Sequence, residues 1–330
     1  MKIGITERGD ASIDYQWKGK LPSVDGAILI TKNLTDQFID TVIKCYENGD
    51  KLIVHATCTG WGGTDFEPNV PDYKTQLHQL KKLINKGFPA DYCVLRIDPI
   101  FPTLFGLKRV MEVLHEFEKQ QTEIQRIRIS IYDEYNHVKE RLKAAGYNPC
   151  YGKNFYASQK QMENVANALR SFSYQFETCA EDLLAKKYPN SFKQVGCVSN
   201  KDIELMGLEP VLNKEENGQQ RTGCHCLTCK TELLTNKYRC PNQCIYCYWR
   251  EKNRRTIMNK RQAKKEYYYG EYLGIRRYNQ ALGVSRYQYL KECTRDLTEQ
   301  YGIERHMEGC YKLRIHTLDR LQNKGRKMIR

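Results

Sequence analysis

Residues 27–57 read AILITKNLTDQFIDTVIKCYENGDKLIVHAT and hold one strand–helix–strand unit. The unit begins and ends with continuous apolar runs, at residues 27–31 and 52–57, as do parallel strands that are buried on both faces. Between the runs, apolar side chains recur at four-residue intervals from Leu34 to Tyr46, which predicts an amphipathic helix. A unit of this kind pairs with further parallel strands, so the stretch indicates an α/β fold.

The same alternation of apolar runs and amphipathic helices extends over the first 180 residues or so. Six runs are candidate strands, at residues 3–6, 27–31, 52–57, 92–97, 127–132 and 174–177. Six βα units do not complete an eight-stranded barrel, which leaves a partial (β/α)6 TIM-like barrel or an open doubly wound sheet. We favour the partial barrel, and in both architectures the site lies at the carboxyl ends of the strands.

Polar side chains stand at two of these predicted strand ends. Thr31, Lys32 and Asn33 close the second run, and Arg96 and Asp98 close the fourth. By the strand-end rule, we expect cofactor contacts from Thr31, Lys32, Asn33 and Arg96, and a catalytic role for Asp98. The alternative for each is that strand ends are polar because they reach solvent.

Six of the 14 cysteines fall within residues 223–248, which read GCHCLTCKTELLTNKYRCPNQCIYCY. Cys240, Cys244 and Cys247 form a C-x3-C-x2-C pattern, with Tyr246 directly before the last cysteine. Three thiolates can bind three irons of a [4Fe–4S] cluster and leave the fourth iron open to another ligand. The pattern therefore predicts an iron–sulfur site.

A structural zinc site is the alternative for the same segment. It would use two C-x2-C pairs, Cys226 with Cys229 and Cys244 with Cys247. The pairs are separated by residues 230–243, slightly fewer than the roughly 15–20 that are usual between such pairs. This alternative gives Cys240 no role, and we favour the cluster.

The C-x3-C-x2-C pattern with its aromatic residue resembles the motif of the radical S-adenosyl-L-methionine (SAM) superfamily. The resemblance implies that Cys240, Cys244 and Cys247 bind a [4Fe–4S] cluster and that SAM binds the open iron beside Tyr246. One electron from the reduced cluster would then produce a 5′-deoxyadenosyl radical that abstracts hydrogen from a substrate. A reductant such as flavodoxin or ferredoxin is implied as a partner.

Three glycines, Gly60, Gly62 and Gly63, follow the third apolar run. Glycine permits close approach of the backbone to a ligand. The superfamily resemblance implies that such a glycine-rich strand end binds the methionine moiety of SAM. Thr64 stands where the family has an acidic residue, and a tight turn explains the glycines equally well.

Short matches in one order also make the chain similar to the domain-of-unknown-function 1848 (DUF1848) family, whose radical SAM-like cysteine cluster lies near the C-terminus. The matches are ITERGD (5–10), TKN (31–33), TGWG (59–62), EPNVP (67–71), RIDPI (96–100), GCHC (223–226) and CIYCY (244–248). The chain departs from the family between Cys226 and Cys240 and in the residues after 248. The resemblance implies the position of the cluster and no substrate.

Five further cysteines are candidates for chemistry. Cys224, Cys226 and Cys229 could bind a second cluster or zinc, or some of them could be spare thiols. Cys58 and Cys179 lie close to predicted strand ends, where either could donate a hydrogen atom to a radical. A buried structural thiol is the more common role for such a cysteine.

The formal charge of the 330-residue chain is +14, and most of it lies in the tail. Residues 248–330 carry 21 Lys and Arg against 9 Asp and Glu, a net charge of +12. Cations interleaved with tyrosines can neutralise phosphates and stack on bases, so residues 250–330 predict binding of nucleic acid or another anionic substrate. A solvated helix face is the alternative. The competing function is a non-catalytic, zinc-stabilised nucleic-acid-binding protein.

These patterns predict three regions. They are a partial barrel at 1–212, a cysteine-rich iron–sulfur segment at 213–249 and a basic helical extension at 250–330. No run approaches eighteen apolar residues and no hydrophobic signal region opens the chain, so we expect no membrane partner. We expect a cytoplasmic protein, because free cysteines persist in a reducing compartment.

Overall fold

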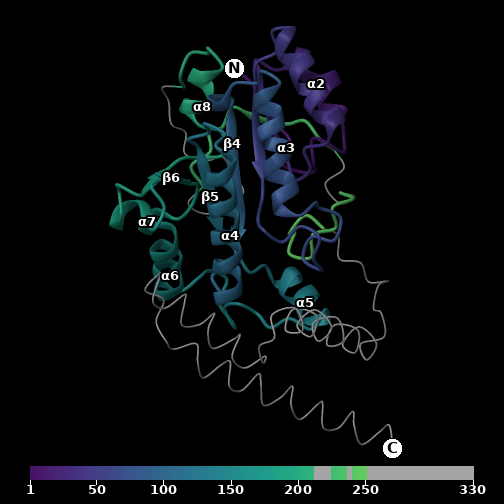
Figure 1. Cartoon of the computed structure of the whole chain (residues 1–330). Coiled ribbons are helices and arrows are strands. Elements are labelled where there is room, and N and C mark those ends of the chain that lie inside the picture. Colours follow the sequence, from purple (N-terminus) through teal and green to yellow (C-terminus); the bar gives the residue numbers. More distant parts are fainter. Residues whose placement is uncertain (212–223, 236–239, 251–330) are drawn as a thin grey trace, which may run out of the picture. The chain divides into compact units, whose positions relative to one another are not determined.

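The computed structural model describes residues 1–211, 224–235 and 240–250 (Figure 1). These residues all belong to one compact unit. The nucleic-acid interface predicted for residues 250–330 lies outside the described residues from position 251 onward, as do residues 213–223 and 236–239 of the predicted iron–sulfur segment.

Eight parallel strands form a single sheet in the described part of the chain. They are β1 (Ile3–Ile5), β2 (Gly26–Thr31), β3 (Leu52–Thr57), β4 (Cys93–Ile100), β5 (Ile127–Ile131), β6 (Phe176–Thr178), β7 (Phe192–Gln194) and β8 (Lys230–Glu232). The sheet order is β7-β6-β5-β4-β3-β2-β1-β8, so every strand up to β7 pairs with the strand before it in the chain.

Helices connect most of these strands. They are α1 (Gln16–Lys20), α2 (Asp36–Glu47), α3 (Tyr73–Asn85), α4 (Leu104–Gln120), α5 (Asn136–Ala144), α6 (Gln159–Leu169), α7 (Asp182–Lys187) and α8 (Asn200–Leu205). Short 3-10 helices add Leu21–Ser23 and Ala90–Tyr92. The long helices begin at polar caps: the hydroxyl of Thr35 accepts from Phe38 N at 3.1 Å, and the Asp72 carboxylate accepts from Lys74 N at 3.0 Å.

The strand order corrects two sequence-based expectations. The strands from β1 to β7 advance in one direction and β8 returns to the free side of β1, an order unlike that of the doubly wound alternative, in which two successive halves diverge from the centre of the sheet. The sheet has eight strands rather than six, because β7 and β8 are three-residue strands, FKQ and KTE, without an apolar run. Between β1 and β7 the crossovers advance in one direction, and right-handed crossovers of this kind place their helices on one face of the sheet. Figure 1 shows α3 and α4 lying along the sheet.

The other face of the sheet packs against the segments that follow β7 and precede β8. A buried cluster joins Ile3, Ile28 and Ile53 of the first three strands to Val198 and Leu227. Burial of aliphatic side chains of this size stabilises a fold by about 1.5–3 kcal/mol each. The cluster therefore holds sequence-distant segments against the first strands.

Residues 224–229 lie between the two edges of the sheet. The amide of Ile3 donates to Cys229 O at 2.9 Å, and the amide of Leu227 donates to Val198 O at 3.0 Å. Gly196 permits this approach, since a Cβ there would lie 2.4 Å from the carbonyl oxygen of His225. The cysteine-rich segment is thus built into the sheet rather than appended to it.

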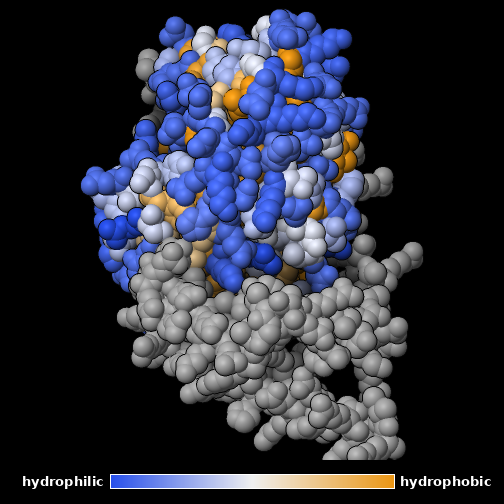
Figure 2. Space-filling view, in the orientation of Figure 1, coloured by the Kyte–Doolittle hydropathy of each residue, from blue (hydrophilic) through white to orange (hydrophobic). Residues whose placement is uncertain are grey.

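The visible face of the described part is mostly hydrophilic, with small hydrophobic areas between the charged side chains (Figure 2). None of the described helices combines the length and the apolar character needed to cross a membrane.

Candidate metal centre

A cavity of about 210 Å³ lies where the carboxyl ends of the parallel strands meet. Each of the first six strands contributes lining residues at or just beyond its end. Among them are Glu7, Thr31, Thr57, Asp98, Tyr132 and Cys179. The same cavity is lined by two sets of cysteines, which are Cys240, Cys244 and Cys247 on one loop and Cys179, Cys197, Cys224 and Cys226 on others.

The loop at residues 240–250 is held by hydrogen bonds from the body of the fold. Arg141 of α5 donates to Ile245 O at 2.8 Å, to Cys247 O at 2.9 Å and to Arg250 O at 2.8 Å. The amide of Ile245 donates to Phe66 O at 2.9 Å. Because one guanidinium binds three carbonyls within and just after the motif, it fixes the curvature of the second half of the loop.

Burial controls the protonation of the motif thiols. It raises the pKa of Cys240 to about 11. Burial also raises the pKa of Cys244, although the cation of Lys32 opposes that rise. Metal ligation requires the thiolate form, so a metal bound here must displace these protons.

A buried ion pair anchors the aromatic residue of the motif. Lys32 Nζ donates to Glu67 Oε1 at 2.8 Å and to the hydroxyl of Tyr246 at 3.0 Å, and that hydroxyl donates to Glu67. The side chain of Glu67 is 0% exposed. Burial lowers the pKa of Lys32, but the charges of Glu67 and Cys244 raise it by more, so Lys32 is a cation. The pair therefore fixes Tyr246 between β2 and the turn that carries Glu67.

Asp10 joins the strand ends to the same loop. Its carboxylate accepts hydrogen bonds from Thr31 Oγ1 at 2.6 Å, from the amide of Lys32 at 2.9 Å and from Asn242 Nδ2 at 2.6 Å. Asn242 lies between Cys240 and Cys244, so Asp10 positions the first half of the motif. No role for Asp10 was predicted from the sequence.

Charged side chains of β4 and β5 also line the cavity. Arg96 pairs with Asp98, and Arg128 donates to Glu177 at 2.9 Å. Burial lowers the pKa of His55 well below its usual value, and the charges of Arg128 and Arg96 lower it further. His55 is therefore neutral beside these two arginines.

Several buried polar atoms at the cavity wall have no hydrogen-bond partner among the described residues. They are Arg8 Nε, Thr57 Oγ1, Tyr132 Oη and Asn242 Oδ1. Buried polar groups are almost always paired in folded proteins. The wall therefore suits a polar ligand.

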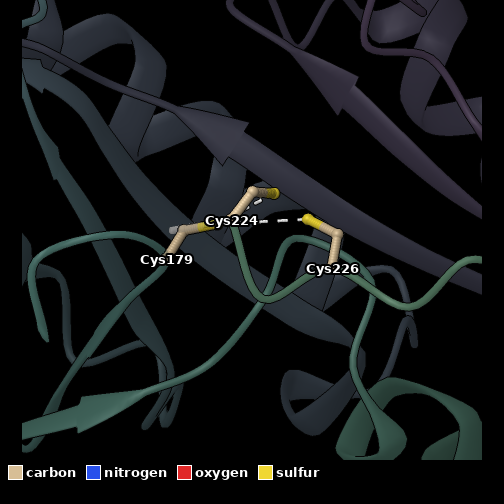
Figure 3. Close-up of side chains that lie close together, drawn as sticks. All are labelled: Cys179, Cys224 and Cys226. Carbon is tan, nitrogen blue, oxygen red and sulfur yellow. Dashed lines mark hydrogen bonds between the residues drawn. The ribbon is translucent and has the colours of Figure 1, made fainter. Parts of the chain in front are cut away.

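The second set of cysteines brings thiols from distant segments together. Cys179 Sγ lies 3.9 Å from Cys224 Sγ and 4.0 Å from Cys226 Sγ (Figure 3). All three sulfurs lie within 4.8 Å of one another, so they could hold a metal ion. Hydrogen bonds from Cys197 and Cys224 lower the pKa of Cys179. Cys179 thus lies with the predicted metal ligands Cys224 and Cys226.

Other predicted site residues lie elsewhere. Cys229 is not in the thiol group, and its carbonyl accepts from Ile3 at the edge of β1. Cys58 is buried behind the cavity wall, and burial raises its pKa to about 12. The amide of Asn33 donates to Thr31 Oγ1 at 2.9 Å. In the part of the chain that the structure describes, Cys229, Cys58 and Asn33 do not line the cavity. The thiols of the two C-x2-C pairs do not gather into one group there either.

The glycines after β3 shape a turn. Gly63 N donates to Val70 O at 2.8 Å, and a Cβ on Gly62 would lie 1.8 Å from Pro71 O. Gly60 has φ +81°, a conformation that favours glycine. Gly60, Gly62 and Gly63 are absent from the described cavity wall, and the turn they form carries Glu67.

Some functional side chains had no sequence signal. Cys197 is isolated in the sequence, and only the fold brings it to the other thiols. Arg141 lies on a helix more than a hundred positions before the loop it binds. Asp10 and Glu67 both fall inside matched motifs, which is a signal that could have marked them as site residues.

Comparison with known proteins identifies the family. No curated protein and no solved structure matches the chain. A family model described as "Domain of unknown function (DUF1848)" matches residues 14–249, from before β2 to the end of the cysteine loop. The match covers well over half of the chain, includes both sets of cavity cysteines and contains all of the short sequence matches except ITERGD at residues 5–10. The chain therefore belongs to the DUF1848 family.

Proposed function

We propose that this protein is a radical SAM-type iron–sulfur enzyme with a partial TIM-like barrel whose site is the strand-end cavity. The observation that carries the proposal is that Cys240, Cys244 and Cys247 all line one cavity at the carboxyl ends of parallel strands. Active sites of barrel enzymes lie at this end of the sheet. The C-x3-C-x2-C spacing supplies three ligands for a cluster with an open iron.

The residues at this site fit a [4Fe–4S] cluster. The three thiols would hold three irons of the cluster, and Arg141 and Asp10 hold the loop in the curvature that presents these thiols. When bound and reduced, a [4Fe–4S] cluster supplies the electron that splits SAM into methionine and a 5′-deoxyadenosyl radical. A one-electron donor such as flavodoxin or ferredoxin would provide that electron.

The cavity wall would bind SAM and the substrate. Thr57 and Tyr132 offer hydroxyl groups without partners among the described residues, and Arg8 offers a free Nε donor. Arg96 and Asp98 place opposite charges on the same wall. These groups favour a polar substrate that carries an anionic portion. Nucleic acid remains our prediction for the substrate through residues 250–330.

The test is anaerobic reconstitution of the full chain with iron and sulfide. We expect a brown protein that absorbs near roughly 400 nm and produces 5′-deoxyadenosine from SAM under reduction. Cys240→Ala should abolish both signals. Cys45→Ala, which removes a buried thiol of α2, should retain them. A reconstituted protein without iron absorbance, or a Cys240→Ala variant that still cleaves SAM, would refute the proposal.

A further inference from the structure

The second set of cysteines contains a fourth thiol. Cys197 belongs to the same buried cluster as Cys179 and Cys226, and its backbone amide donates to Cys226 Sγ at 3.1 Å. Cys179 follows β6, Cys197 follows β7, and Cys224 and Cys226 precede β8. Three separate segments thus converge on the three grouped thiols of Cys179, Cys224 and Cys226 and on the adjacent Cys197.

The two sulfur separations from Cys179 match ligands of a single ion. Thiolates that each lie about 2.3 Å from one tetrahedral zinc are roughly 3.8 Å apart. The separations from Cys179 to Cys224 and Cys226 are 3.9 and 4.0 Å (Figure 3). The cysteines are free, and these distances are about twice the S–S bond of roughly 2.05 Å. Cysteines of a [4Fe–4S] cluster each bind a different iron and lie farther apart than ligands of one ion.

The surroundings suit four thiolates. Lys230, Arg96 and Arg128 lie close enough for their charges to interact with the thiols of this group. A zinc ion with four thiolates carries a net negative charge, which nearby cations offset. The amide of Cys197 that points at Cys226 Sγ is the kind of hydrogen bond that orients a metal-binding thiolate.

His225 is not part of the group, although it lies between two of the cysteines. Its Nε2 lies 3.2 Å from Asp182 Oδ1 and contacts Gln194. The imidazole is therefore directed to α7 and β7. The ligand set is made of sulfur alone, which selects zinc over harder ions such as magnesium.

We propose that Cys179, Cys197, Cys224 and Cys226 bind one structural zinc ion that fastens the β7 end of the sheet to the segment leading into β8. Among the described residues, β7 and β8 share no strand pairing, so the ion would join the two edges where the backbone ladder does not. The inference is independent of the proposed function, because it uses none of the thiols of the C-x3-C-x2-C motif.

The first experiment separates the two metal sites in the full chain. A variant with Cys240, Cys244 and Cys247 all replaced by alanine should lose its iron and retain about one zinc ion per chain by mass spectrometry. Zinc-edge X-ray absorption should show sulfur ligands at about 2.3 Å. A variant that binds no zinc, or whose metal is iron with iron neighbours, would overturn the inference and leave the proposed function standing.

The second experiment tests the choice of ligands by chelator competition. Cys224→Ser should weaken zinc binding at least about tenfold, whereas Cys229→Ser, five positions later on the same segment, should not. Gly196→Ala keeps every thiol but separates residues 195–198 from 224–227, and it should also weaken zinc binding. Equal effects of Cys224→Ser and Cys229→Ser, or no effect of either, would contradict the ligand set.

Discussion

Lys32→Met tests whether the buried Lys32–Glu67 pair holds the cysteine loop on the sheet. The two charges lie 2.8 Å apart, and the side-chain exposures are 16% for Lys32 and 0% for Glu67. Removing one partner of a buried pair costs about 3–5 kcal/mol, because the other charge is left uncompensated. Glu67 keeps its hydrogen bond from Tyr246, so we expect the lower end, about 3 kcal/mol.

The assay is urea unfolding of the full chain without metal, and tryptophan fluorescence monitors the unfolding. Trp61 reports on this region, because it lies in the turn that carries Glu67. Lys86→Met is the matched control. It breaks an exposed pair with Asp40, which is expected to contribute about 0–1 kcal/mol.

A double variant checks the cause of the loss. Lys32→Met combined with Glu67→Gln leaves no buried charge, so it should be more stable than Lys32→Met alone. The reasoning is refuted if Lys32→Met costs no more than Lys86→Met, or if the added Glu67→Gln lowers the free energy of unfolding further.

Three further outcomes are expected. Gly62→Ala should lower the free energy of unfolding by at least about 3 kcal/mol in thermal unfolding, because its Cβ would overlap Pro71 O, whereas Gly63→Ala, with φ +73° and open space, should cost about 1–2 kcal/mol. Burial raises the pKa of Glu232 to about 7 from 4.5, so the folded state binds its proton more tightly and stability should fall as pH rises through that window. Urea midpoints from pH 4.5 to 8 should lack this fall in Glu232→Gln. Arg141→Ala, which frees three loop carbonyls, should lower the iron bound after reconstitution, and unchanged iron would contradict the role of Arg141.

The fold was predictable where one local signal sufficed. The apolar runs of β2 to β5 identify buried parallel strands, because a strand that is covered on both faces lacks the alternating polar side chains of a strand with one exposed face. β7 and β8 were not predictable, since a three-residue segment with at most one apolar side chain forms a strand only when it can pair with the edge of a neighbouring strand. Their existence depends on the completed sheet.

The candidate site divides in the same way. The spacing of Cys240, Cys244 and Cys247 is local, so the sequence alone identifies that set. The contact of Cys197 with Cys179 and Cys226 depends on how two ends of a sheet meet, which no local pattern encodes. The glycines after β3 show the opposite problem: one residue type serves both ligand contact and tight turns, and only the backbone distinguishes them.

The pairing of β1 with β8 has a consequence for synthesis. Among the strands that the structure describes, β1 leaves the ribosome before the others, and β8 leaves it more than 200 residues later, after all the others. Until Lys230–Glu232 emerges, one edge of β1 presents unpaired backbone groups that can recruit a strand from another chain. A nascent chain halted before β8 is therefore prone to aggregate however well its first seven strands have folded. Once the part of the cysteine-rich segment that contains β8 has been translated, it can pair with β1 and cover this edge.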